Sequence, residues 1–363
     1  MKIAVIINSL NIGGAEKLVA DSFPFVREKF PESELIVLKE SKSFIFDSLK
    51  TKAIPVNFLT KASVYNPLLI FKLIPVLKRN EVVHFHLFPT LYWVVLASML
   101  VKKKPYLIYT EHSTYNKRRD SKFFKWLDQC IYSRIDKIVS IADEVDVNLK
   151  THLKHKLDNK IFCINNGVDL ELIKNAKSYT KQELGFKEDD IILLQVSSFR
   201  FPKDQPTLLK ALRKLPSKYK LLLAGDGELR EDNEKLSIEL GVADRVHFLG
   251  NRNDIPQLLK SVDIIVLSSN HEGLSLASIE AMASGKPFIA SDVPGLTEIV
   301  KGYGLVFEKG NTQDLVEKIL NLEQNPDLRH QVIADCQQRA QDFSLQKMLT
   351  AYTSLYLQAT KNN

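Results

Sequence analysis

Short, almost wholly apolar runs rich in β-branched residues alternate with stretches of helical periodicity along nearly the whole chain. Apolar runs without polar alternation are typical of strands buried on both faces. Strands that alternate with helices form parallel sheets, because each crossover needs a helix. The sequence therefore predicts an α/β protein. The runs are KIAVII, ELIVLK, VVHFH, YLIYTEH, KIVSIA and IFCIN, then IILLQVSS, YKLLLAGDG, RVHFLG, DIIVLSS, PFIAS and GLVFE.

The length of the chain and the spread of its polar residues indicate two domains. At 363 residues the chain is long for one compact domain. Apolar density falls between Asn165 and Asp190, so we predict two Rossmann-like, doubly wound domains over residues 1–166 and 167–343. We expect residues 344–363 to form a helix that packs back onto the first domain. One face of that helix would carry Leu345, Met348, Tyr352 and Tyr356.

The cysteines and the apolar segments narrow the class of protein. Three scattered cysteines without metal-ligand spacing indicate a reducing compartment, with no disulfides and no structural zinc. The apolar run at the start is too short for a secretory signal and is expected to form the first strand. The window Val82–Val101 is as long as a membrane span, yet His84, His86 and Pro89 favour a strand, a turn and a buried helix. We therefore expect a cytoplasmic protein.

The net charge of +7 is unevenly distributed. Residues 1–166 hold 26 Lys and Arg against 16 Asp and Glu, a balance of +10, whereas the rest holds 24 against 27, a balance of −3. Basic clusters lie at Lys102–Lys104, Asn116–Trp126 and Lys150–Lys156. Each alone is most simply solvated surface, but together they indicate contact with something anionic. A lipid phosphate or an anionic membrane fits; nucleic acid does not, because no nucleic-acid-binding motif accompanies the charge.

Three segments at expected strand ends carry candidate ligand-binding residues, and each also has an ordinary structural interpretation. Gly13 and Gly14 precede a helix, where backbone amides can approach an anion, but turn glycines are common. His112 follows a strand, and a single histidine is more often structural. Arg200 and Lys203 lie in a polar loop after a strand, where two cations would suit a diphosphate or simply face solvent.

The segment HEGLSLASIEAMASG is predicted as a turn and a helix that ends at Gly285. Glu272 falls in the turn and Glu280 in the helix, while the amides of Gly273–Leu276 form the unpaired helix N-terminus. Glu280 would lie about 6–7 Å from those amides, close to the reach from a ribose to the second phosphate of a nucleotide. Carboxylates accept hydrogen bonds from vicinal hydroxyls. A nucleotide would thus partner both glutamates; the alternative is that Glu280 pairs within the protein.

Together these segments resemble the retaining glycosyltransferases of family 4, which have the GT-B fold. The resemblance rests on SSNHEGLSLASIEAMASGKPFIASDVPGLTEIV, with GGAEKLVADSF, EHS, INNGVD, LLLAGDGELR and FLGNRNDIPQLLKSVDIIVLSS in the family's order. It implies two Rossmann-like domains facing a cleft, with the acceptor bound by residues 1–166 and the donor by residues 167–343. It also implies transfer of a sugar from a nucleotide diphosphate sugar to an acceptor hydroxyl with retention of configuration, without a metal or another cofactor.

The resemblance also implies roles for the candidate residues. Glu280 would hold the ribose, while Glu272 and His112 would contact the transferring sugar. Lys203 and Arg200 would neutralise the leaving diphosphate, so that catalysis rests on electrostatic stabilisation after domain closure. Backbone groups would hold the diphosphate at Gly13, Gly14, Gly273, Leu274, Ser275 and Leu276, and the base at Asn251 and Arg252.

One position departs from the family pattern. In many members an arginine lies five positions before the lysine, and Ser198 occupies that donor-loop position here. Arg200, three positions before Lys203, would have to substitute from a different loop geometry. His271 fits no metal or base motif and receives no role.

Two other functions remain open. One is another GT-B enzyme, such as a sugar-nucleotide epimerase, against which the Glu–x7–Glu helix and GGAE argue. The other is a non-catalytic nucleotide-sugar-binding module or a bilobed ligand sensor, and a sensor would normally be exported or carry an output domain. For the acceptor, the basic first half indicates a lipid-linked glycan of envelope or capsular polysaccharide synthesis, used at the inner face of the cell membrane.

Overall fold

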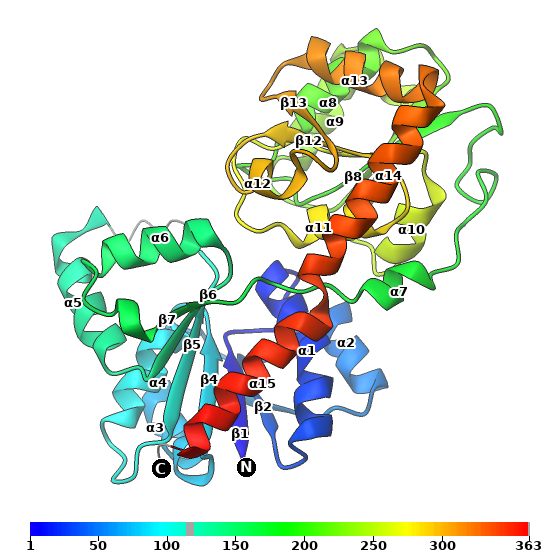
Figure 1. Cartoon of the computed structure of the whole chain (residues 1–363). Coiled ribbons are helices and arrows are strands. Elements are labelled where there is room, and N and C mark those ends of the chain that lie inside the picture. The colour runs from blue at the N-terminus through cyan, green and yellow to red at the C-terminus, as the bar shows by residue number, and fades with distance from the viewer. Residues whose placement is uncertain (114–119, 362–363) are drawn as a thin grey trace. The chain divides into compact units, whose positions relative to one another are not determined.

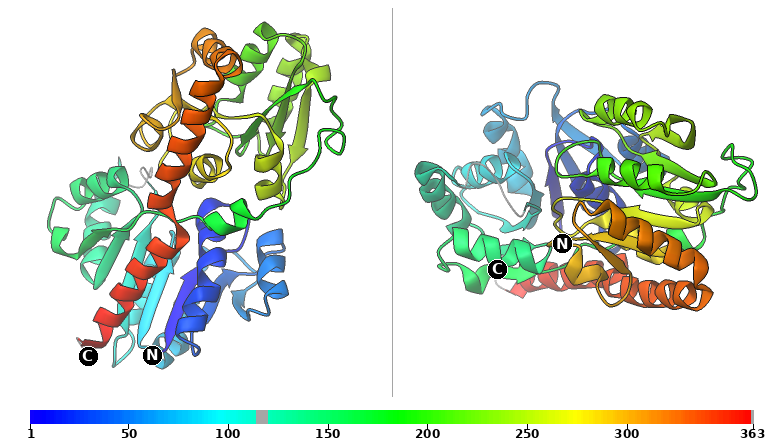
Figure 2. Two further views of the ribbon diagram at one scale, coloured as in Figure 1. Left: turned by 45° about the vertical axis from the view of Figure 1, so that its right-hand side comes forward. Right: turned by 90° about the horizontal axis from the view of Figure 1, so that it is seen from above.

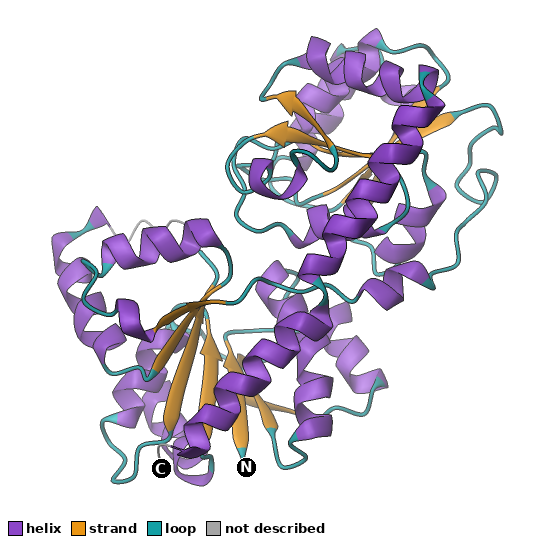
Figure 3. Ribbon diagram, in the orientation of Figure 1, coloured by secondary structure: helices purple, strands orange, loops and turns teal. Residues whose placement is uncertain are grey.

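The computed structural model describes residues 1–113 and 120–361, and its contacts divide the chain into two compact units (Figure 1). Unit 1 comprises Met1–Gly167 and Leu345–Asn363, and unit 2 comprises Val168–Ser344. Each unit is a parallel sheet covered by helices (Figure 3). Part of one predicted basic cluster, Asn116–Arg119, and the last two positions of the predicted C-terminal helix lie outside the described residues.

Unit 1 contains a seven-stranded parallel sheet. Its strands are β1 (Ile3–Ile7), β2 (Glu34–Lys39), β3 (Val56–Thr60), β4 (Val82–His86), β5 (Tyr106–Glu111), β6 (Lys137–Ser140) and β7 (Ile161–Cys163). Their order is β3-β2-β1-β4-β5-β6-β7, so the winding direction reverses between β1 and β4. The central strands β1 and β4 are buried along their whole length, which explains their unbroken apolar character.

Helices cover both faces of this sheet. They are α1 (Gly14–Lys29), α2 (Phe44–Thr51), α3 (Leu69–Arg79), α4 (Thr90–Ser98), α5 (Lys122–Ser133), α6 (Asp143–His152) and α15 (Leu345–Lys361). Figures 1 and 2 show α15 crossing one face of the sheet beside α1. Successive strand residues point to opposite faces, so Val83 and Phe85 join the core with α3 and α4, whereas His84 and His86 face α1 and α15.

Unit 2 contains a six-stranded parallel sheet. Its strands are β8 (Ile191–Val196), β9 (Tyr219–Ala224), β10 (Val246–Gly250), β11 (Ile264–Leu267), β12 (Phe288–Asp292) and β13 (Leu305–Glu308). Their order is β10-β9-β8-β11-β12-β13, so the winding reverses between β8 and β11. In doubly wound sheets, ligands bind outside the carboxyl ends of the strands at such a reversal.

The helices of unit 2 precede, connect and follow these strands. They are α7 (Leu170–Lys174), α8 (Gln205–Lys214), α9 (Arg230–Glu239), α10 (Ile255–Ser261), α11 (Leu276–Ala283), α12 (Thr297–Val300), α13 (Thr312–Gln324) and α14 (Pro326–Ala340). Helices α8, α9 and α13 pack together, and α11 packs against α10 and α14. Right-handed crossovers from strands on either side of the reversal place these two groups on opposite faces of the sheet.

The predicted α/β class is confirmed, and the structure contains one strand that the sequence analysis did not name. Strand β3 lies at the edge of its sheet, and its residues are mostly half-buried, with Asn57 exposed. An edge strand needs less apolar character than a central one, so its pattern is weaker. The apolar window Val82–Val101 forms β4, a turn and α4, as predicted. Across residues 1–113 and 120–361, no helix combines the length and the apolar character that crossing a bilayer requires.

Candidate functional site

The loops that follow β8 and β11 lie side by side at the reversal of the unit 2 sheet. Lys203 and Ser269 form an antiparallel bridge between them. Next to it, the Asp204 N–H donates to the Ser268 carbonyl oxygen over 3.1 Å. These backbone bonds place the predicted cationic loop against the start of the predicted glutamate segment.

Lys203 and Glu272 form an ion pair between these two loops. The Lys203 ammonium donates to Glu272 Oε1, which also accepts a 2.6 Å hydrogen bond from Ser269 Oγ. Their side chains are only 16% and 9% exposed, so solvent screens the pair weakly. An ammonium carries three N–H donors, and Glu272 takes one of them. A cation held in this way can bind an anion without first being brought into position.

The N-terminus of α11 comes directly after Glu272. Within the described part of the chain, the N–H groups of Gly273, Leu274, Ser275 and Leu276 donate no hydrogen bond, and the Ser275 side chain makes no capping bond. Unpaired amides at the positive end of a helix dipole attract anions. The helix ends at Ala283 with Ser284 as its C-cap, and Gly285 follows at φ +79°, the glycine at which the sequence predicts the helix to end.

Glu280 lies on the same helix and is only 8% exposed. It comes four residues after Leu276, a rise of about 6 Å along the helix axis. The helix therefore presents, in order, a carboxylate in the preceding turn, a set of amides and a second carboxylate.

A glycine after β12 supports the turn that holds Glu272. Gly295 has φ +82°, and a Cβ there would lie 2.2 Å from the carbonyl oxygen of Glu272 and 2.7 Å from that of Gly273. Only glycine fits this backbone and this approach. The sequence analysis gave Gly295 no role, although a Pro-Gly pair shortly after a strand is a signal for a constrained turn.

Two further glycines brace the loop after β8. Gly225 and Gly227, at φ +137° and +155°, would place a Cβ 2.0 Å from the Ser197 carbonyl oxygen and 2.4 Å from that of Phe199. The Phe199 N–H donates to the Asp226 carbonyl oxygen over 3.0 Å. The GDG segment therefore supports the neighbouring loop with its backbone. The sequence analysis assigned it no site residue, although two glycines at a strand end already indicate close backbone approach.

The structure joins Ser198 to Arg200. The Arg200 Nε–H donates to Ser198 Oγ over 3.1 Å, and the Ser198 carbonyl oxygen accepts from Gln205 Nε2 over 3.0 Å. Arg200 itself is exposed. A neutral hydroxyl anchors the guanidinium without neutralising it, so Arg200 keeps its charge for another partner.

Arg252 is held by the protein itself. Its Nε and Nη2 donate to the two carboxylate oxygens of Asp254 over 2.8 and 2.5 Å, and the Tyr179 hydroxyl donates to Asp254 over 2.7 Å. These bonds lower the pKa of Asp254. Asn251, next to Arg252, is exposed. Because the Arg252 guanidinium is already bonded to Asp254, the groups of this loop that can contact a ligand are mainly its backbone and the Asn251 side chain.

The remaining predicted residues belong to unit 1. Gly13 is the extended N-cap of α1, with φ −171°, and Gly14 is the first helical residue. A Cβ at Gly13 would lie 2.3 Å from Glu16 Oε2, the end of a flexible side chain that can move aside, so neither space nor backbone angle demands glycine there. His112 follows β5, and its Nε2 lies 3.0 Å from Nδ1 of His86. Burial lowers the pKa of His112 to about 4, so its imidazole is neutral near pH 7.

Unit 2 thus gathers most of the predicted site residues at one sheet edge: a cation paired with a carboxylate, unpaired helix amides and a second buried carboxylate. This set of groups suits a ligand that carries both phosphates and hydroxyls. Among the residues that the structure describes, no group of three or more His, Cys, Asp and Glu side chains is arranged to hold a metal ion.

Both halves of the chain match known family patterns. Residues 177–339 match the family described as Glycosyl transferases group 1, and residues 12–172 match Glycosyltransferase Family 4. The Anabaena protein Alr3699/HepE, solved in complex with UDP-glucose, is similar with a TM-score of 0.85 over 99% of this chain and 100% of that chain. At 22% identity, this likeness confirms the predicted fold class, GT-B.

Curated relatives are similar over part of their length. N-acetyl-alpha-D-glucosaminyl L-malate synthase of Bacillus anthracis is 28% identical over 220 residues, 59% of this chain and 58% of that protein. UDP-Gal:alpha-D-GlcNAc-diphosphoundecaprenol alpha-1,3-galactosyltransferase of Escherichia coli is 26% identical over 308 residues, 79% of each chain. For three of the curated relatives, the synthase among them, the match spans 39 to 62% of the relative's own length.

Proposed function

The chain belongs to the family 4 glycosyltransferases, and from this premise we propose that it transfers a sugar from a nucleotide diphosphate sugar to an acceptor hydroxyl with retention of configuration. The observation that carries the proposal is the Lys203–Glu272 ion pair beside the unpaired amides of Gly273–Leu276. Together these groups form a fixed binding surface for a diphosphate at the reversal of the unit 2 sheet.

The departing diphosphate gains negative charge as the bond to the sugar breaks. The Lys203 ammonium and the α11 amides stabilise that charge, and they are in place before the reaction because Glu272, Ser269 and the helix backbone hold them. Arg200 adds a second cation at the same loop. Each pre-positioned donor of this kind contributes about 3–4 kcal/mol to transition-state stabilisation.

The two carboxylates bind the two ends of the donor. Glu280 accepts hydrogen bonds from the ribose hydroxyls, at a helix rise from the amides that is close to the reach from a ribose to the second phosphate. Glu272, in the turn before the helix, accepts from a hydroxyl of the sugar. The backbone near Asn251 contacts the base. We infer that His112 and the Gly13–Gly14 segment of unit 1 serve the same reaction.

For the acceptor we propose a lipid-linked glycan of polysaccharide synthesis. The Escherichia coli relative is named for an undecaprenyl diphosphate-linked sugar, although it is only 26% identical. In this chain, helix α5 exposes Phe123 and Trp126, at 62% and 61%, next to the exposed lysines Lys122 and Lys125. A helix that presents aromatic rings together with cations suits the surface of an anionic bilayer.

Donor turnover tests the proposed function. The purified protein is incubated with a panel of uridine, guanosine and adenosine diphosphate sugars, and nucleoside diphosphate release is measured with and without a polyprenyl diphosphate-linked sugar. We expect release from one donor class, faster with acceptor, and a large loss in Lys203→Ala. Binding without turnover would favour a non-catalytic module, and neither binding nor turnover with any donor would contradict the proposal.

A further inference from the structure

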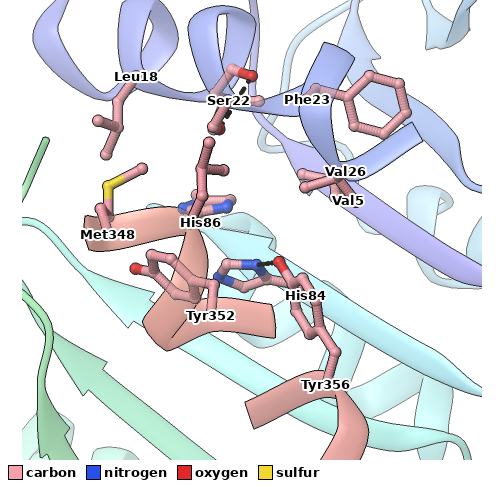
Figure 4. A pocket seen from close by; sticks show the side chains of 12 residues that line it. Val5, Leu18, Ser22, Phe23, Val26, His84, His86, Met348, Tyr352 and Tyr356 are labelled. Carbon is pink, nitrogen blue, oxygen red and sulfur yellow. Dashed lines mark hydrogen bonds between the residues drawn. The ribbon is translucent and has the colours of Figure 1, made fainter. Parts of the chain in front are cut away.

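Behind His112, unit 1 contains two buried histidines that the proposed function does not use. His84 and His86 lie two residues apart on β4, so both point to the face covered by α1 and α15. They are only 3% and 4% exposed. Figure 4 shows their rings one above the other, between side chains of α1 and the tyrosines of α15.

His84 is fixed through both ring nitrogens. Nδ1 lies 2.7 Å from the Tyr356 hydroxyl, and Nε2 lies 2.8 Å from Thr110 Oγ1. Thr110 Oγ1 in turn lies 3.0 Å from the Tyr352 hydroxyl. A ring with both nitrogens bonded to groups on a strand and a helix has one orientation.

His86 packs on this fixed ring and reaches His112. The ring centroids of His84 and His86 are 4.3 Å apart. On its other side, His86 Nδ1 lies 3.0 Å from His112 Nε2. Burial lowers the pKa of His112 to about 4 and that of His86 well below its usual value, so both rings are neutral near pH 7. In a hydrogen bond between neutral imidazoles one nitrogen donates and the other accepts, so the tautomer of His112 is coupled to that of His86.

We propose that His86 is a positioning residue that fixes the ring orientation and the tautomer of His112, so that Nδ1 of His112 is the atom that contacts the transferring sugar. Within the residues that the structure describes, His112 Nε2 is bonded to His86 whereas Nδ1 makes no hydrogen bond. The contact between Nδ1 and the sugar rests on the proposed function. The hydrogen bond and the tautomer involve residues of unit 1 alone and do not depend on that function.

A small cavity lies next to His86, on the side that faces α1 and α15. It has a volume of about 20 Å³ and is lined by His84, His86, Met348 and the two tyrosines, among others. That is room for about one water molecule. A side chain at position 86 that does not bond to His112 can use this space, and the imidazole of His112, without its bond at Nε2, can then sample other orientations and its second tautomer.

Two variants and a control separate positioning from packing. His86→Leu removes the hydrogen-bonding nitrogen, and His86→Asn keeps an amide near the position of Nδ1. Tyr352→Phe removes a buried hydroxyl of the same network and leaves the bond between His86 and His112 intact. Thermal unfolding of all three variants shows whether each one folds. If one does not fold, the other two still test the proposal.

The first readout is independent of any reaction. Nitrogen NMR of ¹⁵N-histidine-labelled protein reports the tautomer of each imidazole. We expect one tautomer for His112 in the wild type and in Tyr352→Phe, and a mixture in His86→Leu. A mixture in the wild type, or one unchanged tautomer in His86→Leu, would overturn the proposal.

The second readout is donor turnover. We expect kcat in His86→Leu to fall by about 10- to 100-fold, because a misplaced contact group costs that much, while the donor KM changes by about threefold or less. His86→Asn should recover part of the loss, and Tyr352→Phe should keep the wild-type kcat. Equal kcat in His86→Leu and wild type would overturn the positioning role. A wild type that turns over no donor would instead contradict the proposed function, and the NMR result would still decide whether His86 fixes the tautomer.

Discussion

Lys203 and Glu272 are 69 positions apart in the sequence, yet they form an ion pair where the strand order of the second sheet reverses. Each follows one of the two neighbouring strands β8 and β11. The pair therefore ties the cationic loop to the turn that begins α11, and each group sets the position of the other. A ligand that arrives here meets a cation already held in place.

Removing this cation should abolish most of the transfer activity. We expect Lys203→Ala to lower kcat by about 100- to 1000-fold, because a fixed donor to the departing diphosphate is lost and, among the described residues, the Glu272 carboxylate keeps only its hydrogen bond from Ser269. Lys210→Ala, at an exposed position of α8, is the matched control and should retain activity. Steady-state donor turnover measures both. Comparable losses in the two variants would point to a general charge effect.

The ribose role of Glu280 has a specific binding signature. Hydrogen bonds to a charged group contribute about 1.5–3 kcal/mol, so Glu280→Ala should weaken nucleoside diphosphate binding by about 10- to 150-fold. Binding of inorganic pyrophosphate, which lacks a ribose, should not change. Isothermal titration calorimetry with both ligands measures the difference. Unchanged affinity for the nucleoside diphosphate would remove Glu280 from the site.

Alanine substitutions at two glycines with similar φ angles distinguish the cost of backbone strain from the cost of a steric clash. A Cβ at Gly295, where φ is +82°, would collide with the Glu272 carbonyl, whereas a Cβ at Gly302, where φ is +89°, would meet nothing within 4 Å. Gly302→Ala should therefore cost about 1–2 kcal/mol, the cost of the left-handed backbone alone. Gly295→Ala should cost more and should also weaken donor binding. Urea unfolding followed by circular dichroism tests the order, and equal costs would contradict it.

The buried histidines of unit 1 should make it sensitive to acid. Burial lowers the pKa of His84 to about 3 and that of His86 well below its usual value, while both titrate near 6.5 in an unfolded chain. As pH falls below about 6.5, the unfolded state binds protons that the folded state does not, so the free energy of unfolding decreases towards pH 3. Each histidine contributes a slope of about 1.4 kcal/mol per pH unit.

Tryptophan fluorescence can follow this effect in unit 1 alone, since both tryptophans of the chain, Trp93 and Trp126, lie there. Urea titrations between pH 7 and pH 4 should give a shallower slope in His86→Leu than in the wild type. His155→Gln, at an exposed position, should keep the wild-type slope. A slope that does not change in His86→Leu would contradict the prediction.

The exposed rings of α5 should bind anionic bilayers. We expect Phe123→Ser with Trp126→Ser to lower sedimentation with phosphatidylglycerol vesicles by about tenfold or more, since two large apolar side chains no longer enter the interface. Added salt should weaken the binding of the wild type. Neutral phosphatidylcholine vesicles are the control. Equal binding to both lipids, or no effect of the double substitution, would argue against this surface.

The sequence was sufficient to predict the fold class because strands buried on both faces leave unbroken apolar runs. Central strands such as β4 and β2 were predicted residue for residue. Strand β3 was not predicted, because an edge strand tolerates exposed polar residues such as Asn57 and its pattern becomes indistinct. The apolar pattern of a sequence thus predicts strands that are buried, and it predicts partly buried strands less well.

The contacts of the candidate site were not predictable in the same way. The sequence indicated that Glu272 needs a partner, but nothing local to it selects Lys203, which is brought near by the fold of the sheet. The glycine at position 295 supports Glu272 only through a positive φ and a close backbone approach. His86 was considered only as a reason to reject a membrane span, although two histidines spaced by one residue on a strand must share a face.

Because α15 belongs to unit 1, the two units can complete their folds at different points during synthesis. Unit 2 is one continuous segment, so it can fold as soon as Ser344 has left the ribosome. Unit 1 is made first, yet the hydrogen bond between His84 and Tyr356 spans 272 positions and must wait for the last helix. Until then, the face of its sheet between α1 and β4 lacks its cover and exposes apolar surface. The nascent first unit therefore exposes this surface until α15 is made, and removal of α15 would damage unit 1 directly.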